Sequence, residues 1–506
     1  MDFQGRNVLV VGLARTGQAT AEFLLRRGAR VTVTESKSLA ALGPRAAALA
    51  RRGVKFETGG HTLASFLEAD LIIPSPGVPR HPEFAAAIAR GIPVWSEIEL
   101  AARFLKGTII GITGTNGKST TTTLLHRILK DAGRKAFLAG NIGTPLISFV
   151  DRSREDHLYV TEISSFQLEY IREFRVALAL ILNLSGNHID WHGDMESYAA
   201  AKKKLLLGQK AGDAAVLNRE DARIWAWKDE AVSEIHGFSS KRPVRRGAFI
   251  RDGWVIVRDV CDNQVVSGNR DNRVDRMTPP QFEDHKLNVV RDDRVTPPRF
   301  EDHKLNVVRD REERRILPVS EIKLPGLHNR ENVLAAAAAA RILGVAPSRI
   351  RASVRRFRGL EHRLEPVATV RGVSFVNDSK ATTVDAALKA LASFSKPVVL
   401  ILGGKDKGSD FRPLRRAVRR GVKSVVLVGA AREKIRAALA GTVPMVEAQT
   451  YPEVVRAAYA AASPGDVVLL APACTSWDMF RDFEERGRVF KREVRRLAGR
   501  PGRKRG

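Results

Sequence analysis

The stretch Thr113-Gly114-Thr115-Asn116-Gly117-Lys118-Ser119-Thr120 decides the fold of this chain. An apolar run at residues 108–112 precedes it, and leucine and isoleucine recur at helical spacing over residues 121–133. Strand, glycine-rich turn and helix are the context that a phosphate-binding loop needs. The glycines let backbone N–H groups surround an anion, and the helix N-terminus adds partial positive charge. The stretch therefore predicts a mononucleotide-binding α/β domain.

The loop also assigns roles to its side chains. Lys118 would reach the terminal phosphates, and Ser119 or Thr120 would hold Mg²⁺. The usual phosphate-loop spacing needs glycine at position 112, where this chain has Ile112, so the match is to a shorter form. The alternative is an ordinary glycine-rich turn. The predicted ATP contacts of the loop are Gly114, Thr115, Asn116, Gly117, Lys118, Ser119, Thr120 and Thr121.

Composition limits the class of protein. The chain has 506 residues, enough for two to four domains, and a net charge of +28. Such a charge favours anionic partners, but aromatic residues make up only 6% and do not alternate with basic ones, so we expect no nucleic-acid binding. The basic tail at 495–505 is typical of a solvated or disordered end. Two cysteines, no signal peptide and no apolar run of membrane-spanning length predict a cytoplasmic protein.

The N-terminus predicts a Rossmann-like unit. A buried strand at 7–11 leads into Gly12-Leu13-Ala14-Arg15-Thr16-Gly17, then a helix and a second strand at 30–33. Ala14 occupies the second glycine position of the dinucleotide fingerprint, so the turn predicts room for one diphosphate rather than NAD. A purely structural domain is the alternative. Further strands are expected at 70–74 and 92–95.

Later strands carry polar residues where they end. A strand at 158–162 ends in Glu162, which we expect to face Mg²⁺ across from the phosphate loop because open α/β sheets bind ligands at that edge. His188 follows a strand at 177–183, and by itself a loop histidine is more often structural. A helix begins at Tyr198. Strands at 373–376, 398–402 and 467–470 predict another α/β domain.

One segment is duplicated. Residues 276–292 recur almost verbatim at 294–310, with Thr-Pro-Pro near the start of each copy. Two copies of this length are too few for a solenoid, so we interpret the pair as a tandem surface insertion. A metal site is disfavoured because no second ligand stands at metal spacing from either histidine.

Five runs together resemble the Mur ligase family, which forms amide bonds in peptidoglycan precursor synthesis. They are the phosphate loop, Ser75-Pro76-Gly77-Val78-Pro79, Ser164-Ser165-Phe166-Gln167-Leu168-Glu169, Asn377-Asp378-Ser379-Lys380-Ala381-Thr382 and Ala473-Cys474-Thr475-Ser476. The resemblance implies an α/β protein of three domains. These are a Rossmann-like UDP-sugar domain at 1–98, a central ATP domain at 99–358 that carries the insertion at 271–312, and a Rossmann-like amino-acid domain at 359–506.

The activity implied by the resemblance is ATP- and Mg²⁺-dependent addition of D-glutamate to UDP-N-acetylmuramoyl-L-alanine through an acyl phosphate. We expect a monomer. Implied catalytic residues are Lys118, Glu162, His188, Lys202 and Lys380, and implied metal ligands are Ser119, Glu162, His188 and Lys202 if it is carbamylated. Further ATP contacts would be Asn329, Asn332, Arg363 and Asp378. The UDP-sugar contacts would be Arg15, Thr16, Ser36, Lys37, Asn141 and Ser164, and the D-glutamate contacts Thr382, Lys407, Ser476 and Phe483.

The chain departs from the family pattern at three places: Asn187 and Ala471 stand where relatives have aspartate and serine, and Lys405 is an additional lysine near Lys407. Asn329 is also a candidate helix cap. Two rival functions stay open. One is a sibling ligase of the Mur or folylpolyglutamate type with another amino acid, and the other is a basic nucleic-acid-dependent ATPase. The sequence does not decide between D- and L-glutamate.

Overall fold

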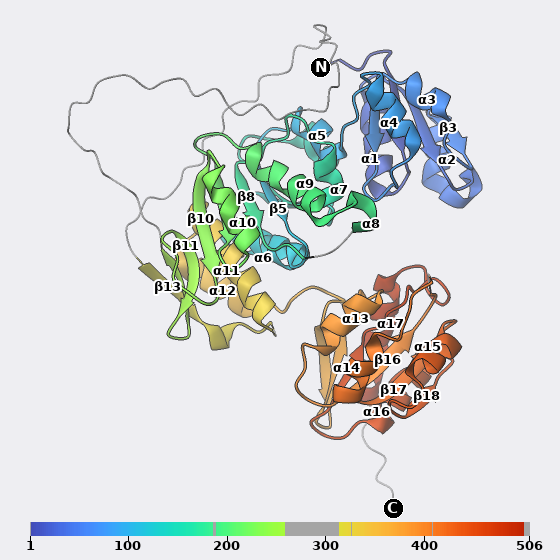
Figure 1. The fold of residues 1–506 in the computed structure, drawn as a ribbon, viewed down its shortest axis with the longest axis vertical. Coiled ribbons are helices and arrows are strands. Elements are labelled where there is room, and N and C mark those ends of the chain that lie inside the picture. The colour runs from blue at the N-terminus through green and yellow to red at the C-terminus, as the bar shows by residue number, and fades with distance from the viewer. Residues whose placement is uncertain (1, 186–188, 259–312, 325, 407, 500–506) are drawn as a thin grey trace, which may run out of the picture. The chain divides into compact units, whose positions relative to one another are not determined.

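The computed structural model describes residues 2–185, 189–258, 313–324, 326–406 and 408–499. Three β-sheets with helices packed on them make up the described chain (Figure 1). This confirms the expected α/β class with three sheets. By its internal contacts the chain divides into two units, Met1–Ile322 with Leu327–Arg355, and Lys323–Gly326 with Arg356–Gly506. The domain limits at 98 and 358 stay predictions. Among the described residues, every helix is too short or too polar to cross a membrane.

The first sheet is fully parallel and has the order β3-β2-β1-β4. Its central strand β1 is buried along four of five residues, as expected for a strand covered on both faces. The elements are β1 (Asn7–Val11), α1 (Arg15–Arg26), β2 (Arg30–Glu35), η1 (Leu39–Leu42), α2 (Pro44–Arg51), β3 (Lys55–Thr58), α3 (Leu63–Leu67), β4 (Leu71–Pro74) and α4 (Pro82–Ala89).

The second sheet has nine strands in the order β13-β12-β11-β10-β9-β8-β5-β7-β6. All pairs among β5 to β11 are parallel, whereas the pairs β11–β12 and β12–β13 are antiparallel. The strands are β5 (Thr108–Thr113), β6 (Ala136–Gly140), β7 (Leu158–Glu162), β8 (Leu178–Ile181), β9 (Ala214–Asn218), β10 (Glu234–Ser239), β11 (Gly247–Arg251), β12 (Trp254–Arg258) and β13 (Glu313–Pro318).

Helices flank this sheet, and the alanine-rich α11 is buried along most of its length. Small side chains let a helix approach the sheet and α6 closely. The helical elements are α5 (Glu97–Ala102), α6 (Lys118–Asp131), η2 (Leu146–Arg152), α7 (Ser165–Glu169), α8 (Ile189–His192), α9 (Met195–Leu207), α10 (Ala222–Ala226), η3 (Trp227–Asp229), η4 (Val319–Glu321), α11 (Leu327–Ile342) and α12 (Pro347–Arg356). The duplicated segment lies between β12 and β13, outside the described residues.

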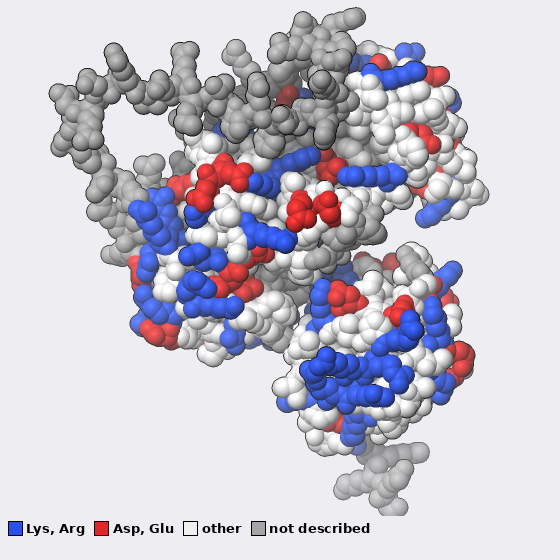
Figure 2. Space-filling view, viewed as in Figure 1, with Lys and Arg blue, Asp and Glu red and all other residues white. Residues whose placement is uncertain are grey.

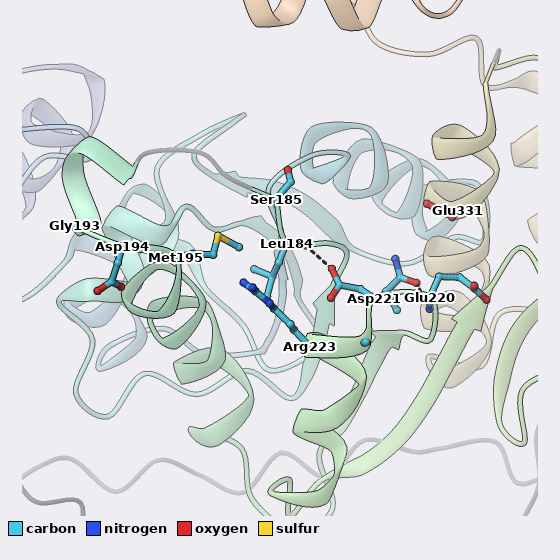
Figure 3. A pocket seen from close by; sticks show the side chains of 11 residues that line it. Leu184, Ser185, Gly193, Asp194, Met195, Glu220, Asp221, Arg223 and Glu331 are labelled. Carbon is cyan, nitrogen blue, oxygen red and sulfur yellow. Dashed lines mark hydrogen bonds between the residues drawn. The ribbon is translucent and has the colours of Figure 1, made fainter.

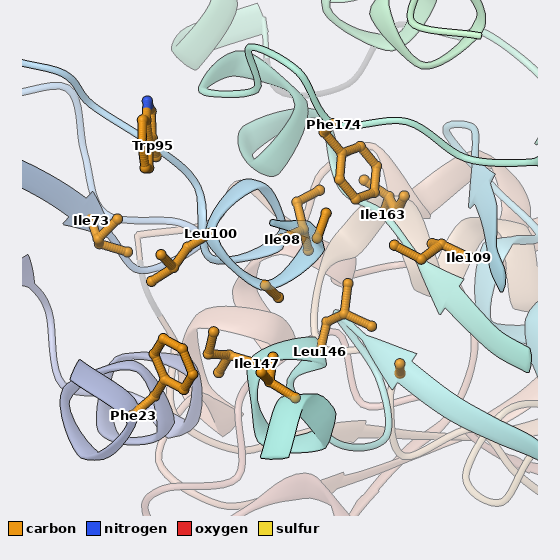
Figure 4. Packing of buried hydrophobic residues seen from close by; sticks show 14 of the residues in the cluster. Phe23, Ile73, Trp95, Ile98, Leu100, Ile109, Leu146, Ile147, Ile163 and Phe174 are labelled. Atoms are coloured by element: carbon orange, nitrogen blue, oxygen red, sulfur yellow. The ribbon is translucent and has the colours of Figure 1, made fainter. Parts of the chain in front are cut away.

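The first two sheets share one hydrophobic core, which α5 and η2 complete (Figure 4). Phe23 of α1, Leu100 of α5 and Ile147 of η2 are all at most 1% exposed. Two buried carboxylates add polar links. Glu97 accepts from the backbone N–H of Ile147 at 2.7 Å, and burial raises its pKa to about 7. The hydrogen bond of Glu97 thereby joins α5 to η2 inside this shared core.

The third sheet belongs to the second unit and has the order β14-β15-β19-β16-β17-β18, parallel except for the pair β14–β15. Its elements are β14 (Glu365–Val370), β15 (Val373–Asn377), α13 (Val384–Leu391), β16 (Val398–Gly403), α14 (Leu414–Gly421), β17 (Val422–Val428), α15 (Arg432–Leu439), β18 (Met445–Glu447), α16 (Tyr451–Ala461), β19 (Val467–Leu470) and α17 (Phe483–Ala498).

The expected strand at 92–95 is wrong. Only Val94 pairs there, in an isolated bridge to Ile72, because α5 begins at Glu97 and ends the extended segment. The helix after the phosphate loop begins at Lys118, earlier than the apolar periodicity from 121 indicates, because its first turn is polar. The antiparallel strands β11 to β13 were not expected from the sequence.

Glu99 is the second buried carboxylate, and we expect it to be needed for stability. It is fully buried, pairs with Arg103 at 2.7 Å, and accepts from the backbone N–H groups of Arg172, Glu173 and Phe174. The variant Glu99→Ala should lower the free energy of unfolding by about 3–5 kcal/mol, because it removes the buried partner of Arg103 and leaves three backbone N–H groups unpaired. Urea unfolding followed by tryptophan fluorescence measures this loss. The exposed Glu68→Ala is the control and should stay within about 0.5 kcal/mol; equal losses would contradict the assignment.

Candidate functional site

The phosphate loop connects β5 to α6, and β5 lies between β8 and β7 in the second sheet. Gly114 and Gly117 have φ angles of +150° and +81°, a backbone form that glycine adopts readily. The end of neighbouring strand β8 supports the loop, since Asn183 accepts from Thr115 N–H through its carbonyl oxygen and from Asn116 N–H through Oδ1, both at 2.8 Å. The loop is therefore a preformed turn at the N-terminus of a 14-residue helix.

Lys118, the first residue of α6, keeps its ammonium over this loop. Its Nζ donates to the carbonyl oxygens of Gly114 at 2.8 Å and Thr115 at 2.9 Å. Ser119 is buried in the same turn. The ammonium of Lys118 and the N–H groups at the start of a helix thus lie at the same loop, which is the arrangement that binds phosphate groups.

Asn332 of α11 packs directly against the loop. A Cβ added to Gly117 would lie 2.2 Å from Asn332 Oδ1, which also accepts from Thr121 Oγ1 at 3.2 Å. Asn329 Oδ1 in turn accepts from Asn332 Nδ2 at 3.1 Å. The two asparagines implied by the resemblance therefore lie together beside the loop, although they are separated from it by more than 200 residues.

Glu162 ends β7, the strand next to β5. Its side chain is 2% exposed, and Oε1 accepts from Asn141 Nδ2 at 2.7 Å. Its other oxygen, Oε2, is buried and has no hydrogen-bond partner among the described residues. A buried carboxylate oxygen that has no protein partner fits the ligand position that a hard cation needs.

Lys202 of α9 lies beside the end of β5, near Glu162, and is 1% exposed. Its Nζ is 3.4 Å from Thr113 Oγ1 and 4.6 Å from the centre of the Tyr198 ring. Burial holds the pKa of Lys202 well below its ordinary value, nearby Lys118 lowers it further, and Glu162 acts in the opposite direction. The structure thus brings Lys118, Glu162 and Lys202 together, and their catalytic roles stay predictions.

Ser164 caps α7 through a capping box with Gln167, so its hydroxyl already has a hydrogen-bond partner within the protein.

His192 is a buried histidine that the sequence analysis did not single out. Its Nε2 is 3.0 Å from Ser165 Oγ, and its ring meets that of Tyr198, whose hydroxyl is 3.0 Å from Thr115 Oγ1. Only its distance of four residues from the predicted ligand His188 could have drawn attention to it.

The edge of the first sheet holds the predicted UDP-sugar residues. A Cβ on Gly17 would lie 2.1 Å from the Gly12 carbonyl oxygen, so the turn needs glycine there. Glu35 accepts from Leu13 N–H at 2.9 Å and from Ser36 Oγ at 3.1 Å. Burial acts to raise the pKa of Glu35, but these hydrogen bonds prevail and lower it. Arg15, Ser36 and Lys37 are exposed and Thr16 is half-buried at the same edge.

The second unit gathers its own predicted residues where β15 and β19 end. Burial raises the pKa of Asp378 to about 6, against the effect of Arg363 and Lys380 nearby. Lys380 Nζ lies 5.4 Å above the Phe483 ring. Beneath them the fully buried Arg486 donates to Ser379 O at 2.8 Å and to Cys474 O at 3.1 Å. Arg486 therefore ties two sequence-distant loops together, and the sequence analysis missed it.

Some of the remaining predicted contact residues are described by the structure, and others lie outside the described residues. Ser476 is buried and Thr382 half-buried in the second unit. Lys405 is exposed, and its backbone pairs with Thr475. His188 and Lys407 lie outside the described residues, so their roles stay predictions. Burial raises the pKa of the Cys474 thiol to about 12, which disfavours Cys474 as a nucleophile.

An open hollow of about 950 Å³ adjoins the phosphate loop where β8 and β9 end (Figure 3). Asp221 Oδ2 accepts from Leu184 N–H at 2.8 Å and fixes its wall. Glu331, which lies between the two asparagines of α11, faces it from the other side. Carboxylates around the hollow suit the hydroxyl groups of a sugar rather than phosphate.

Lys and Arg cover much of the face of the second unit seen in Figure 2. On α14, Arg416, Arg419 and Arg420 are exposed.

Within the described residues, no group of three or more His, Cys, Asp or Glu side chains is arranged to hold a metal. The expected metal site would instead combine one carboxylate with Ser119, Lys202 and His188.

Comparisons with known proteins match all three sheets. Residues 6–96 match the Mur ligase MurD-like N-terminal domain, residues 112–252 the Mur ligase middle domain, and residues 362–474 the Mur ligase glutamate ligase domain. The structure resembles UDP-N-acetylmuramate-alanine ligase MurC from Thermotoga maritima, with a TM-score of 0.53 at 18% identity over 97% of this chain and 99% of that one.

Relatives are similar over almost their whole length. A UDP-N-acetylmuramoylalanine–D-glutamate ligase of Acidobacterium capsulatum is 46% identical over 97% of this chain and 96% of its own. A ligase of the same name from Koribacter versatilis is 43% identical over 98% and 99%.

The contact between Gly117 and Asn332 generates a prediction. Gly117→Ala should weaken binding of an ATP analogue by about tenfold or more, because the added Cβ displaces the loop from the phosphates. Gly133→Ala is a matched control at the far end of the same helix. Its φ is also +81°, but an added Cβ would meet nothing within 4 Å. Calorimetric titration should show binding within about twofold of the wild type for the control, and equal weakening in both variants would rule out the contact.

Proposed function

Because the chain belongs to the Mur ligase family, we propose that it is an ATP-dependent ligase that joins D-glutamate to UDP-N-acetylmuramoyl-L-alanine. The observation that carries the proposal is the grouping of Lys118, Glu162 and Lys202 beside the phosphate loop. The end-to-end similarity to relatives with that activity in their names supports the choice of substrates. The enzyme would act in the cytoplasm, as a monomer, in the peptidoglycan synthesis that cell shape and division require.

The reaction would take place in two steps. A carboxylate oxygen of the muramyl substrate attacks the γ-phosphorus of ATP, the bond to the β-phosphate oxygen breaks, and ADP leaves. The amine of D-glutamate then attacks the acyl carbon of this acyl phosphate. The tetrahedral intermediate releases phosphate, and the amine proton passes to solvent. Such chemistry depends mainly on positioning and charge neutralisation.

Residues of the first unit would hold the nucleotide and the carboxylate. Lys118 and the N–H groups at the start of α6 would bind the transferred phosphoryl group, whose charge they neutralise. Asn329 and Asn332 would contact the nucleoside, with the ribose toward the hollow in Figure 3. Arg15, Thr16, Ser36 and Lys37 would bind the UDP end of the sugar substrate, and Asn141 and Ser164 its other end.

Mg²⁺ would fit Glu162 Oε2, the buried oxygen without a partner among the described residues, together with Ser119, His188 and Lys202. When bound it would neutralise phosphate oxygens. Lys202 would contribute as a carbamate. Its buried amine is favoured in the neutral form, so Nζ can bond to the carbon of CO₂ and lose a proton to solvent. That change converts a buried cation into an oxygen ligand.

The second unit would supply the amino-acid contacts. Lys380 would neutralise the acyl phosphate and the tetrahedral intermediate, while Asp378 and Arg363 would face the nucleotide. Thr382, Lys407, Ser476 and Phe483 would bind D-glutamate. The burial of Ser476 and the contact of Lys380 with Phe483 support these assignments.

One assay distinguishes this function from its rivals. ADP release in the presence of UDP-N-acetylmuramoyl-L-alanine should require D-glutamate, and neither L-glutamate nor nucleic acid should replace it. Lys118→Ala should lower kcat by about 10²–10³-fold, because the transferred phosphoryl charge loses its nearest cation.

Lys130→Ala is the control, since that lysine is exposed at the other end of α6. Nucleic-acid-stimulated ATP hydrolysis with a steep dependence on salt would favour the basic ATPase instead. Normal ATP consumption by Lys118→Ala would refute the ligase mechanism.

Lys202 has its own prediction. Incubation with ¹³C-labelled bicarbonate should give a carbamate signal by NMR in the wild type, and Lys202→Arg should abolish it and lower kcat by about 10²-fold or more. The neighbouring Lys203→Arg is the matched control, because Lys203 points to Glu230 on the surface. A signal that persists in Lys202→Arg but disappears in Lys203→Arg would assign the modification to the other lysine.

A further inference from the structure

The turn that precedes β14 in the second unit has an unusual backbone. His362 and Leu364 have φ angles of +63° and +41°, in the left-handed region that residues other than glycine rarely adopt. Arg363, a predicted nucleotide contact, stands between them. Such a conformation persists only where the surrounding structure holds it, and it is concentrated at sites that bind ligands. The contacts that hold this turn therefore also fix where Arg363 begins.

The same turn is bonded to the segment that follows β15. The carbonyl oxygen of His362 accepts from the backbone N–H of Lys380 at 3.1 Å. Asp378 Oδ1 accepts from the backbone N–H of Leu364 at 3.3 Å. A shift of the turn would therefore move Arg363 and the backbone of Lys380 together.

Glu365, the first residue of β14, connects the turn to its supports. Its Oε2 accepts from the backbone N–H of His362 and from Asn377 Nδ2, each at 2.9 Å. Its Oε1 accepts from the ammonium of Lys491 at 2.9 Å, and Glu361 Oε1 accepts from the same ammonium. One cation thus joins the two carboxylates that stand on either side of the turn in the sequence.

Lys491 reaches the turn from the last helix, α17. This helix is anchored, because Phe490 and Val494 are fully buried in the core of the third sheet. Lys491 itself is 8% exposed. Burial acts to lower the pKa of Lys491, but its hydrogen bonds to Glu361 and Glu365 prevail and raise it, so the ammonium stays charged. Hydrogen bonds between charged groups are the strong ones, which suits a contact that must hold a strained turn.

We propose that Lys491 is a positioning residue that fixes the turn of Arg363 and, through that turn, the backbone of Lys380. This role rests on the proposed function, in which Arg363 faces the nucleotide and Lys380 the acyl phosphate. Without the ammonium, the carboxylates of Glu361 and Glu365 would repel each other, and the left-handed backbone between them would lose its support. Lys491 acts through these residues rather than on a substrate.

The test measures the Kd of a non-hydrolysable ATP analogue by calorimetric titration of the full chain. Lys491→Met keeps the length of the side chain and removes its charge. We expect it to raise this Kd by about tenfold and to lower kcat, because two charge-assisted hydrogen bonds at the turn are lost. The Kd of UDP-N-acetylmuramoyl-L-alanine, whose predicted contacts lie in the first unit, should stay within about twofold of the wild type.

A double-mutant cycle with Arg363→Ala tests whether Lys491 acts through the turn. In the Arg363→Ala background, Lys491→Met should change the Kd of the ATP analogue by about twofold at most, because the side chain that it positions is already absent. Additive effects of the two substitutions would overturn the inference. Lys491→Arg retains the cation and should bind the analogue more tightly than Lys491→Met does, and the reverse order would count against the role.

Lys423→Met is the matched control. Lys423 also donates to a carboxylate of this unit, Asp466, at 3.0 Å, but it lies on β17, which is not a neighbour of β14 in the sheet. The control should bind the ATP analogue within about twofold of the wild type. Equal weakening by Lys423→Met and Lys491→Met would show a merely structural role and overturn the inference, and so would an unchanged Kd in Lys491→Met. Wild-type protein that binds the analogue but joins no D-glutamate would instead refute the proposed function.

Discussion

The burial of a lysine beside a second lysine and a carboxylate is the constraint on which the rest of the site depends. Lys202 is almost fully buried, with Lys118 and Glu162 nearby. Burying charge is expensive unless it is paired, and here two cations share one carboxylate. The arrangement favours a neutral amine at Lys202, beside the ammonium of Lys118 that donates to the loop carbonyls. The local sheet order β8-β5-β7 makes this possible, because three parallel strands end at the same edge.

Backbone conformation provides the second requirement. The left-handed φ of Gly117 opens the start of α6, and Asn332 occupies the space that a side chain at this position would fill. The loop is thus in contact with α11 on one side and with Asn183 beyond β8 on the other. A phosphate site built in this way needs little reorganisation when it binds an anion, and low reorganisation is what electrostatic catalysis requires.

The shared core of the first two sheets has a functional consequence. Phe23, Leu100 and Ile147 belong to one hydrophobic cluster (Figure 4). The carboxylates of Glu97 and Glu99 accept hydrogen bonds from backbone N–H groups beside it. The turn at Gly12 and the phosphate loop are therefore parts of one compact unit. The residues around Lys380 belong to a separate unit.

The sequence by itself determined the elements whose signals are local. The strands at 7–11, 158–162 and 467–470 agree with the structure to the residue, because continuous apolar runs bounded by turns identify buried strands. The glycines at 114 and 117 and the placement of Lys118 also follow from local pattern. The assignment of Glu162 and Lys202 to one site came from a family resemblance, since nothing local relates a strand end to a helix 40 residues later.

Only the tertiary structure decided the contacts between distant segments. The packing of Asn332 on Gly117, the bonds from buried Arg486 to Ser379 and Cys474, and the bond from Lys491 to Glu361 involve residues far apart in the chain. The expected strand at 92–95 failed for a similar reason, since the segment pairs with β4 only at Val94 before α5 begins at Glu97. The sequence pattern predicts which face of a helix or strand is buried, whereas long-range packing decides which element lies against that face.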